Sequence, residues 1–198
     1  MRLPAPRKWG SFDVELFSSY RLRWPSKYSR VPDTVIENWV HRHWRDFQRW
    51  LPLNPLEWQY EIRVMGNDEI MSVRHVGDWQ KTLDGWGDDL FEGRMRKTTW
   101  LGRYLLETGT TPAPIIVAAN AGSWAHPREH GRQMCEPYQL VEGHLRLAYL
   151  RAMIRRDQRE LRASHEVVVA TLPFNRSIDT DVLSAGVASL LSAGHLQR

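Results

Sequence analysis

The sequence predicts an α/β fold in which helices flank a small mixed sheet. Three short apolar runs, at 114–118, 138–141 and 167–170, are typical of buried strands. Apolar residues spaced three and four apart occur before and between these runs, and that period predicts helices. The composition agrees with a folded chain, because 42% of the 198 residues are hydrophobic and 25% are charged.

Residues 1–93 are expected to form a Trp-rich, mainly helical region packed on the sheet. Asp33 is a suitable N-cap, and an apolar stripe follows it at helical spacing until Pro52 ends the helix. The stripe consists of Ile36, Trp39, Val40, Phe47, Trp50 and Leu51. Burying each large apolar side chain is worth about 1.5–3 kcal/mol, so we expect residues 1–51 to belong to the folded unit.

The next segment predicts a strand, a turn and a helix. Side chains alternate from Trp58 to Val64, and Met65–Asp68 is a suitable turn into Ile70–Val76, which would complete a hairpin. The same stretch also tolerates a helix, so both alternatives stay open. A helix is expected from Asp78 to Phe91, weakened by its two glycines.

Residues 94–172 are expected to form the core, and 173–198 a closing amphipathic helix. In the core, the helix after Thr99 ends at Gly109. A long loop, 119–136, joins the first two predicted strands. The expected core elements are the helix 100–108, the strand 114–118, the strand 138–141, the helix 143–156 and the strand 167–170.

Several function classes are excluded by composition. Cys135 is the only cysteine, which rules out an intrachain disulfide and favours a reducing, cytoplasmic setting. No apolar run of about 18 residues is present, so we expect neither a transmembrane helix nor a membrane partner. The net charge of +4 is compatible with an anionic partner without being diagnostic of one.

Residues 142–146, Glu-Gly-His-Leu-Arg, stand where the second core strand meets the next helix. Gly143 permits a tight turn and the close approach of an anion to the free first amides of that helix. His144 and Arg146 can add hydrogen bonds and charge to a phosphate. Glu142 is suited to act as a base, a ribose contact or a ligand of metal-bound water. The other interpretation is a purely structural turn with solvated His144 and Arg146.

A glycine-ended helix, an apolar strand, a second strand and then Glu-Gly-His-x-Arg on a helix resemble the ParB/sulfiredoxin superfamily over residues 94–172. The resemblance implies that the turn binds nucleotide phosphates, here through Gly143, His144 and Arg146. It also implies that the basic segment around Arg96 packs near the site. Arg96 is therefore a further candidate phosphate ligand, while no metal ligand is assigned beyond Glu142.

Two departures narrow what the resemblance implies. Leu145 replaces the first arginine of the ParB box, which argues against the nucleotide-driven clamp of chromosome partition. Cys135 precedes the second strand instead of lying in the turn, which argues against sulfinic-acid reduction. The broader ParB-like class remains. It includes bacterial nucleases and nucleotide hydrolases, for which a nucleoside triphosphate with a divalent metal such as Mg²⁺ is the expected ligand.

Two functions stay open. The first is an enzyme or nucleotide switch that binds a nucleotide or a nucleic-acid phosphate, with Glu142 and His144 as catalytic residues that hydrolyse a phosphoester or phosphoanhydride. The second is a non-catalytic module that binds DNA or a protein through the Trp- and Arg-rich N-terminal surface. Convergence of Glu142 and Arg146 on one open cleft would favour the first function.

Two histidine patterns predict no metal site. His126 and His130 are four residues apart, but Pro127 and Gly131 indicate a loop, so a solvated or phosphate-contacting loop is expected there. His41 and His43 are two residues apart on the helix that follows Asp33, so they cannot share a face, and His43 is expected to flank the N-terminal core.

Overall fold

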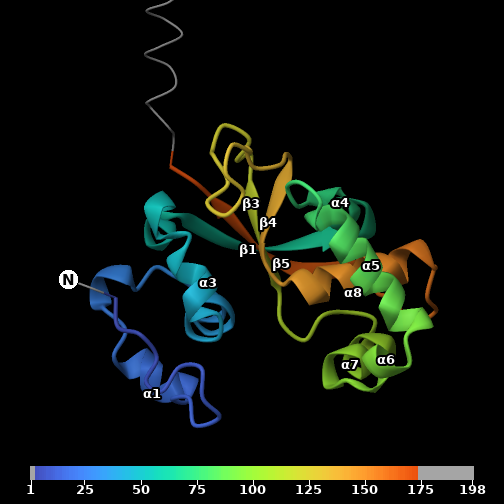
Figure 1. Cartoon of the computed structure of the whole chain (residues 1–198), viewed down its shortest axis with the longest axis horizontal. Coiled ribbons are helices and arrows are strands. Elements are labelled where there is room, and N and C mark those ends of the chain that lie inside the picture. The colour runs from blue at the N-terminus through green and yellow to red at the C-terminus, as the bar shows by residue number, and fades with distance from the viewer. Residues whose placement is uncertain (1–2, 174–198) are drawn as a thin grey trace, which may run out of the picture.

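The computed structural model describes residues 3–173 and contains a five-stranded mixed sheet with helices on both faces (Figure 1). The strands are β1 (Gln59–Gly66), β2 (Val73–Arg74), β3 (Ile115–Ala119), β4 (Tyr138–Glu142) and β5 (Ser164–Thr171). Their order is β1-β5-β3-β4-β2, in which β3 pairs with β5 and β2 with β4 in parallel, and the other two pairs are antiparallel. The predicted α/β fold and its three core strands are therefore confirmed.

Of the two alternatives left open for this stretch, the hairpin is wrong, and a helix forms in part of it. After β1 the chain forms α4 (Asn67–Ser72), and β2 then pairs with β4 at the opposite edge of the sheet. The reason is local, because the backbone N–H of Gly66 donates to Glu69 Oε2 (3.2 Å) and Asp68 and Glu69 lie in the first helical turn. Carboxylates at that position stabilise a helix N-terminus. The residues expected to turn the chain therefore begin a helix instead.

Each face of the sheet is covered by a different set of helices. One face carries short N-terminal segments and a core rich in aromatic side chains, which we call the aromatic layer. Its segments are α1 (Phe17–Leu22), η1 (Ser26–Tyr28), α2 (Asp33–Val35), the π-helical η2 (Ile36–His41), α3 (Trp44–Gln48), η3 (Leu51–Leu53) and η4 (Pro55–Glu57).

The opposite face is covered by helices and mostly aliphatic side chains, which we call the aliphatic layer. Its helices are α4, α5 (Trp79–Glu92), α6 (Arg94–Thr98), α7 (Trp100–Thr108) and α8 (His144–Arg155), of which α5, α7 and α8 are longer than any helix of the aromatic layer. Successive strand residues point to opposite faces, so Ile115 packs in the aliphatic layer and Ile116 in the aromatic one. Figure 1 shows α3 and α8 on opposite sides of the strands.

The helix expected from Asp33 to Leu51 is interrupted. Its first part contains the π-helical segment, and the chain leaves helical geometry at His43 (φ −118°, ψ 42°). Leu51 is 37% exposed, so its assignment to the apolar stripe is wrong, whereas the other five predicted members are buried. A π-turn and a break each shift the phase of the helix, so the 3.6-residue period does not continue to Leu51.

Helices α5 and α8 pack closely because of one glycine. A Cβ added at Gly87 would lie 2.5 Å from the carbonyl oxygen of Ala148, so a larger residue would push the helices apart. Ion pairs also join the two helices, as between Arg156 Nη1 and Asp88 Oδ1 (3.0 Å). The glycine expected to weaken α5 thus allows it to pack on α8.

Strands from both sides of residue 93 share the one sheet, since β1 and β2 come from residues 1–93 and β3, β4 and β5 from 94–172. The helix predicted within 173–198 falls almost wholly outside the described residues. None of the helices described between residues 3 and 173 is long and apolar enough to cross a membrane.

Candidate functional site

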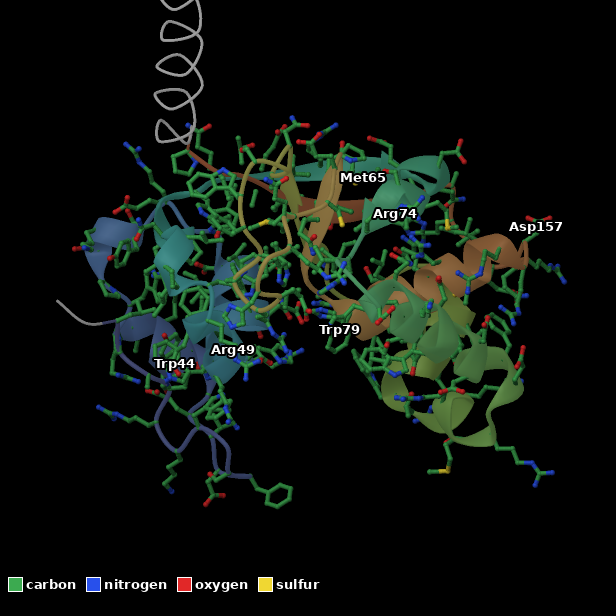
Figure 2. All side chains as sticks on the ribbon, turned by 45° about the horizontal axis from the view of Figure 1, so that its top comes forward. Trp44, Arg49, Met65, Arg74, Trp79 and Asp157 are labelled. Atoms are coloured by element: carbon green, nitrogen blue, oxygen red, sulfur yellow. The ribbon has the colours of Figure 1, made fainter. Side chains whose placement is uncertain are left out.

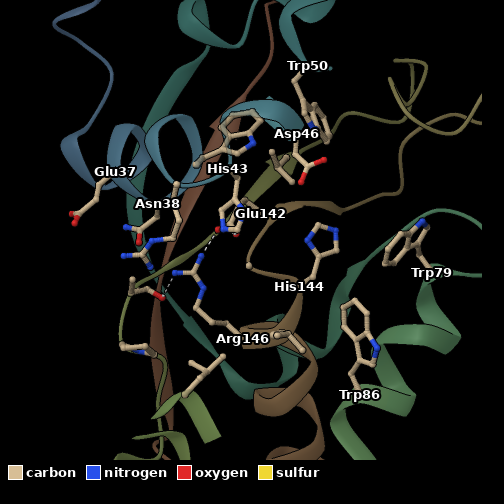
Figure 3. A pocket seen from close by; sticks show the side chains of 18 of the residues that line it. Glu37, Asn38, His43, Asp46, Trp50, Trp79, Trp86, Glu142, His144 and Arg146 are labelled. Carbon is tan, nitrogen blue, oxygen red and sulfur yellow. Dashed lines mark hydrogen bonds and ion pairs between the residues drawn. The ribbon is translucent and has the colours of Figure 1, made fainter. Parts of the chain in front are cut away.

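A cleft of about 590 Å³ opens between the two layers at the N-terminus of α8 (Figure 3). Ligand pockets commonly measure about 300–1,000 Å³. Four predicted site residues line it, namely Glu142, Gly143, His144 and Arg146. The remaining lining residues are Glu37, Asn38, Trp39, Arg42, His43, Asp46, Trp50, Trp79, Trp86, Trp100, Leu101, Pro112, Ala113, Arg128, Val141 and Leu145. The cleft therefore draws its walls from both layers.

The turn at Gly143 has the conformation that the sequence predicts. Its φ is +99°, and an added Cβ would lie 2.7 Å from Ile115 Cγ2, so both backbone and packing require glycine. The first hydrogen bond of α8 runs from Leu147 N–H to Gly143 O (2.8 Å). The preceding amides of His144 and Arg146 therefore have no partner within the helix, and they lie at its positive end.

Glu142 and Arg146 form an ion pair on the cleft floor, and their side chains are 11% and 10% exposed. Arg146 also donates from Nη1 to the carbonyl oxygen of Ala113 (3.3 Å), and His43 Nε2 lies 3.4 Å from Glu142 Oε1 (Figure 3). Glu142 thus faces the cleft between two basic groups and does not point into a packed core. The carboxylate holds the Arg146 guanidinium in place at the base of α8.

His144 lies between this ion pair and two tryptophans of α5 (Figure 3). Its Nε2 atom is buried and has no hydrogen-bond partner within the described part of the chain. Burial, reinforced by the neighbouring basic side chains, lowers the pKa of His144 to about 3. The ring is therefore neutral at pH 7, where it can exchange hydrogen bonds with a ligand but cannot supply positive charge or act as an efficient general acid.

Two further histidines lie close to His144. The ring centroids of His75 and His144 are 5.1 Å apart, and those of His75 and His126 are 5.2 Å apart. Nδ1 of His126 accepts the backbone N–H groups of Arg128 (3.3 Å) and Glu129 (3.2 Å), which leaves the proton of the neutral ring on Nε2. That Nε2 is also buried without a partner among residues 3–173. Burial lowers the pKa of His126 to about 4.

The expectation of a solvated loop is wrong for His126. Its side chain is 3% exposed and packs against Trp50, with ring centroids 5.3 Å apart, whereas His130 is exposed. A bridge between Ala125 and Gln133 closes the loop on itself, and the enclosed His126 ring packs against Trp50. The ring pairs with its own backbone and does not join His130.

The same loop links the two walls of the cleft. Arg128 Nη1 lies 3.8 Å from Asp46 Oδ1 on α3, and its guanidinium carbon lies 5.9 Å from the centre of the Trp79 ring on α5. Glu129 Oε1 accepts a hydrogen bond from Trp79 Nε1 (3.1 Å). Figure 2 places Trp79 on the side of α5 that faces the N-terminal segments. These contacts fix the orientation of the Trp79 ring.

Arg96 does not join the site. It is not among the residues that line the cleft, and its guanidinium lies instead beside Tyr149 of α8. Burial raises the pKa of the Tyr149 hydroxyl, and Arg96 acts in the opposite direction. Packing of α6 against α5 and α7 keeps Arg96 in the aliphatic layer.

The described residues do not form a metal centre. Between residues 3 and 173, no group of three His, Cys, Asp or Glu side chains is placed to hold a metal ion. Both oxygens of Glu142 already face basic partners, Arg146 and His43. The side chains present therefore do not fit a resident metal, although a metal that arrives with a ligand needs few protein ligands.

Sequence patterns did not indicate His43 and Trp79, which line the cleft, or His75, which packs beside His144. They come from separate segments, and none of these segments carries a motif that predicts a ligand. His43 was expected to flank the core, and instead it faces Glu142 with its side chain 43% exposed. Only the packing of the two layers brings these residues together.

Comparison with known proteins found no relative of this chain. No family model, no curated protein and no solved structure matches the chain.

Proposed function

We propose that the cleft binds a phosphate-bearing ligand, either a nucleotide or a nucleic-acid phosphate, with the phosphate at the N-terminus of α8. The proposal is carried by one observation: the first-turn residues of α8, whose amides have no partner within the helix, line the same cleft as the Arg146 side chain. Unpaired amides at a helix N-terminus bind anions, and arginine adds charge-assisted hydrogen bonds.

The ion pair between Glu142 and Arg146 is part of this proposal. The carboxylate neutralises and orients the guanidinium. A bound phosphate competes with the carboxylate for Arg146, because both are acceptors for the same N–H groups. The carboxylate therefore sets the affinity of the cleft for anions and keeps Arg146 positioned before a ligand arrives.

The resemblance to ParB-like domains supports the same assignment. In that superfamily the glycine turn binds nucleotide phosphates, and Gly143, His144 and Arg146 occupy the matching positions. A nucleoside triphosphate that brings its own Mg²⁺ is the ligand class that this resemblance favours.

Hydrolysis of the bound phosphoester or phosphoanhydride is a second candidate function. The position of Glu142 favours this function, because Glu142 lines the same cleft as Arg146. When a phosphate takes the place of the Glu142 carboxylate on Arg146, the carboxylate is released to accept a proton from water. His144 would donate a hydrogen bond in this scheme, since its pKa of about 3 leaves the ring neutral. Binding needs no proton transfer and is the function that the geometry supports best.

A nucleic-acid or protein module that uses the N-terminal surface is less well supported. The rings that would stack on a partner are largely in the core. The buried tryptophans of the first sixty residues are Trp24, Trp39, Trp50 and Trp58.

Calorimetric titration with ATP, CTP and inorganic tripolyphosphate, each with and without Mg²⁺, tests the proposal. Arg146→Ala should weaken binding about tenfold or more, because charge-assisted hydrogen bonds contribute about 1.5–3 kcal/mol. The exposed Arg103→Ala on α7 is the matched control and should bind as the wild type does. Unchanged affinity of Arg146→Ala would remove Arg146 from the site.

Arg146→Ala leaves the Glu142 carboxylate with only one basic neighbour in a mostly buried position, which also costs stability. The double variant Glu142→Gln, Arg146→Ala removes both charges and should show the same loss of affinity. Glu142→Gln alone should bind tripolyphosphate more tightly than the wild type, since it frees Arg146 for the anion. A weaker or unchanged affinity of Glu142→Gln would contradict the competition between carboxylate and phosphate.

A further inference from the structure

We propose that Trp79 and Trp86, together with His144, form a nucleobase subsite, so that the ligand of this cleft is a nucleotide and not a phosphate that lacks an aromatic ring. This inference rests on the proposed phosphate site and identifies what occupies the rest of the cleft.

The two tryptophans differ from those of the core. Trp39 and Trp50 are 1% and 2% exposed, whereas Trp79 and Trp86 are half-buried and line the cleft. The rings of Trp79 and Trp86 meet at 77° with centroids 5.9 Å apart and form an aromatic wall. Tryptophan faces that remain partly open to a cleft are suited to stack on a flat heteroaromatic ring.

The wall is held in place before any ligand binds. Glu129 accepts the indole N–H of Trp79, and Arg128 lies over the same ring. A ring that is already fixed loses little conformational freedom on binding, which favours affinity.

His144 is suited to form a hydrogen bond with the edge of a nucleobase. Its ring centroid lies 5.7 Å from that of Trp79, and its buried Nε2 has no partner among the described residues. A buried polar atom without a partner costs free energy, and a rotation of the His144 ring toward the cleft would let a ligand atom recover it. Because the ring is neutral near pH 7, it is suited to a neutral base edge, while the free amides and Arg146 are suited to the phosphate.

An aromatic wall can also bind a quaternary ammonium ion, but the charges here disfavour that ligand. Arg128 already lies over the Trp79 ring, at 5.9 Å from its centre, and would repel a second cation. The nearest carboxylate on α3, that of Asp46, is paired with Arg128. A neutral ring joined to an anionic group therefore fits both ends of the cleft.

Calorimetry on the full-length protein tests this subsite with a matched pair of probes, ATP or CTP against inorganic tripolyphosphate. The nucleotides should bind at least about fivefold more tightly than tripolyphosphate, which is the lower limit expected for one stacked base. Trp86→Leu should remove this advantage and leave the affinity for tripolyphosphate unchanged. Trp86→Phe retains a stacking ring and should keep most of the advantage. Trp9→Leu, which changes an exposed tryptophan outside the cleft, should have no effect.

The outcomes separate the two proposals. If tripolyphosphate binds as tightly as the nucleotides, or if Trp86→Leu weakens both equally while thermal melting shows a folded protein, the nucleobase subsite is wrong and the phosphate site stands. Should adenosine alone bind as tightly as ATP, the aromatic wall is retained and the phosphate site fails. Absence of binding by every probe would overturn both proposals.

Discussion

The two layers cover opposite faces of one sheet by different means. The aliphatic layer uses regular helices, and a glycine on α5 lets the backbones of α5 and α8 approach closely. The aromatic layer uses segments too short to be stable alone, held by large rings and by hydrogen bonds from indoles to backbone carbonyls. Trp24 Nε1 donates to Tyr28 O (3.0 Å), and Trp58 Nε1 donates to Leu53 O (2.7 Å). In the aromatic layer, large buried rings and indole hydrogen bonds therefore provide the stability that long helices provide in the aliphatic layer.

This difference explains where the cleft forms. A regular helix covers a sheet continuously, whereas the broken path through η2 and α3 leaves side chains such as His43 and Asp46 facing the opposite layer across a gap. The aliphatic layer supplies Arg146 and Trp79 from the other side. Residues from unrelated parts of the sequence therefore meet at the junction of the layers.

Removal of the aromatic layer should have the largest effect. Deletion of residues 1–51 exposes the apolar sheet face around Ile116 and Val168, so the product should be insoluble or molten, without a cooperative thermal transition. Deletion of residues 1–12 alone, of which residues 3–12 are mostly exposed, should leave cooperative melting in place. A soluble, cooperatively melting fragment that starts at Pro52 would show that the aliphatic layer and the sheet are stable without this cover.

Single truncations compare the layers directly. Trp39→Ala should cost about 3–5 kcal/mol, because a buried ring in contact with Phe47, Trp50 and Trp58 is lost. Leu105→Ala, at a fully buried position in the aliphatic layer, removes a smaller side chain and should cost less than Trp39→Ala, within the range of about 2–5 kcal/mol for such truncations. Urea unfolding monitored by circular dichroism gives both values. A larger cost for Leu105→Ala would contradict the view that the aromatic layer depends on its few large rings.

Acid should weaken the junction of the layers. Unfolded histidine has a pKa near 6.5, and burial lowers that of His126 to about 4 in the folded chain. Between these values the unfolded state binds a proton that the folded state does not. Stability is therefore fully present above pH 6.5 and falls toward pH 4, by about 3 kcal/mol for this residue. His144 acts in the same direction.

Urea unfolding of the wild type and His126→Gln at pH 7, 6, 5 and 4.5 measures this loss. The variant should lose less stability over that range than the wild type. The hydrogen bond from Arg23 lowers the pKa of Glu15 to about 2. Glu15 therefore affects stability only below about pH 4.5 and does not interfere with the comparison. Equal pH slopes for the two proteins would mean that His126 titrates alike in the folded and unfolded states.

A pair of glycine substitutions on α5 tests close packing in the aliphatic layer. Gly87→Ala should destabilise by about 1–3 kcal/mol, because its Cβ would collide with the Ala148 carbonyl. Gly85→Ala places its Cβ in open space and should stabilise by up to about 1 kcal/mol through helix propensity. Thermal melting of the two variants should thus shift in opposite directions. A shift in the same direction would show that α5 and α8 can separate at little cost.

Local patterns predicted the three long helices of the aliphatic layer, α5, α7 and α8, closely, whereas the short helices α4 and α6 were not predicted. Helix α7 ends at Gly109 (φ +69°) as its sequence indicates, and α8 begins after Gly143. In the aromatic layer the same method predicted one continuous helix from Asp33 and placed Leu51 on its buried face. A break at His43 changes the phase, and no residue nearby is a recognised helix breaker.

The sequence by itself determined the α/β class, the three core strands and the turn from Glu142 to Arg146, because hydrophobic period and glycine placement act over a few residues. Only the tertiary structure decided that β1 and β2 lie at opposite edges, that His126 is buried beside Trp50, and that His43 faces Glu142. Such contacts join residues 76 to 99 positions apart. They depend on how two layers pack across a sheet, which no local pattern of side chains encodes.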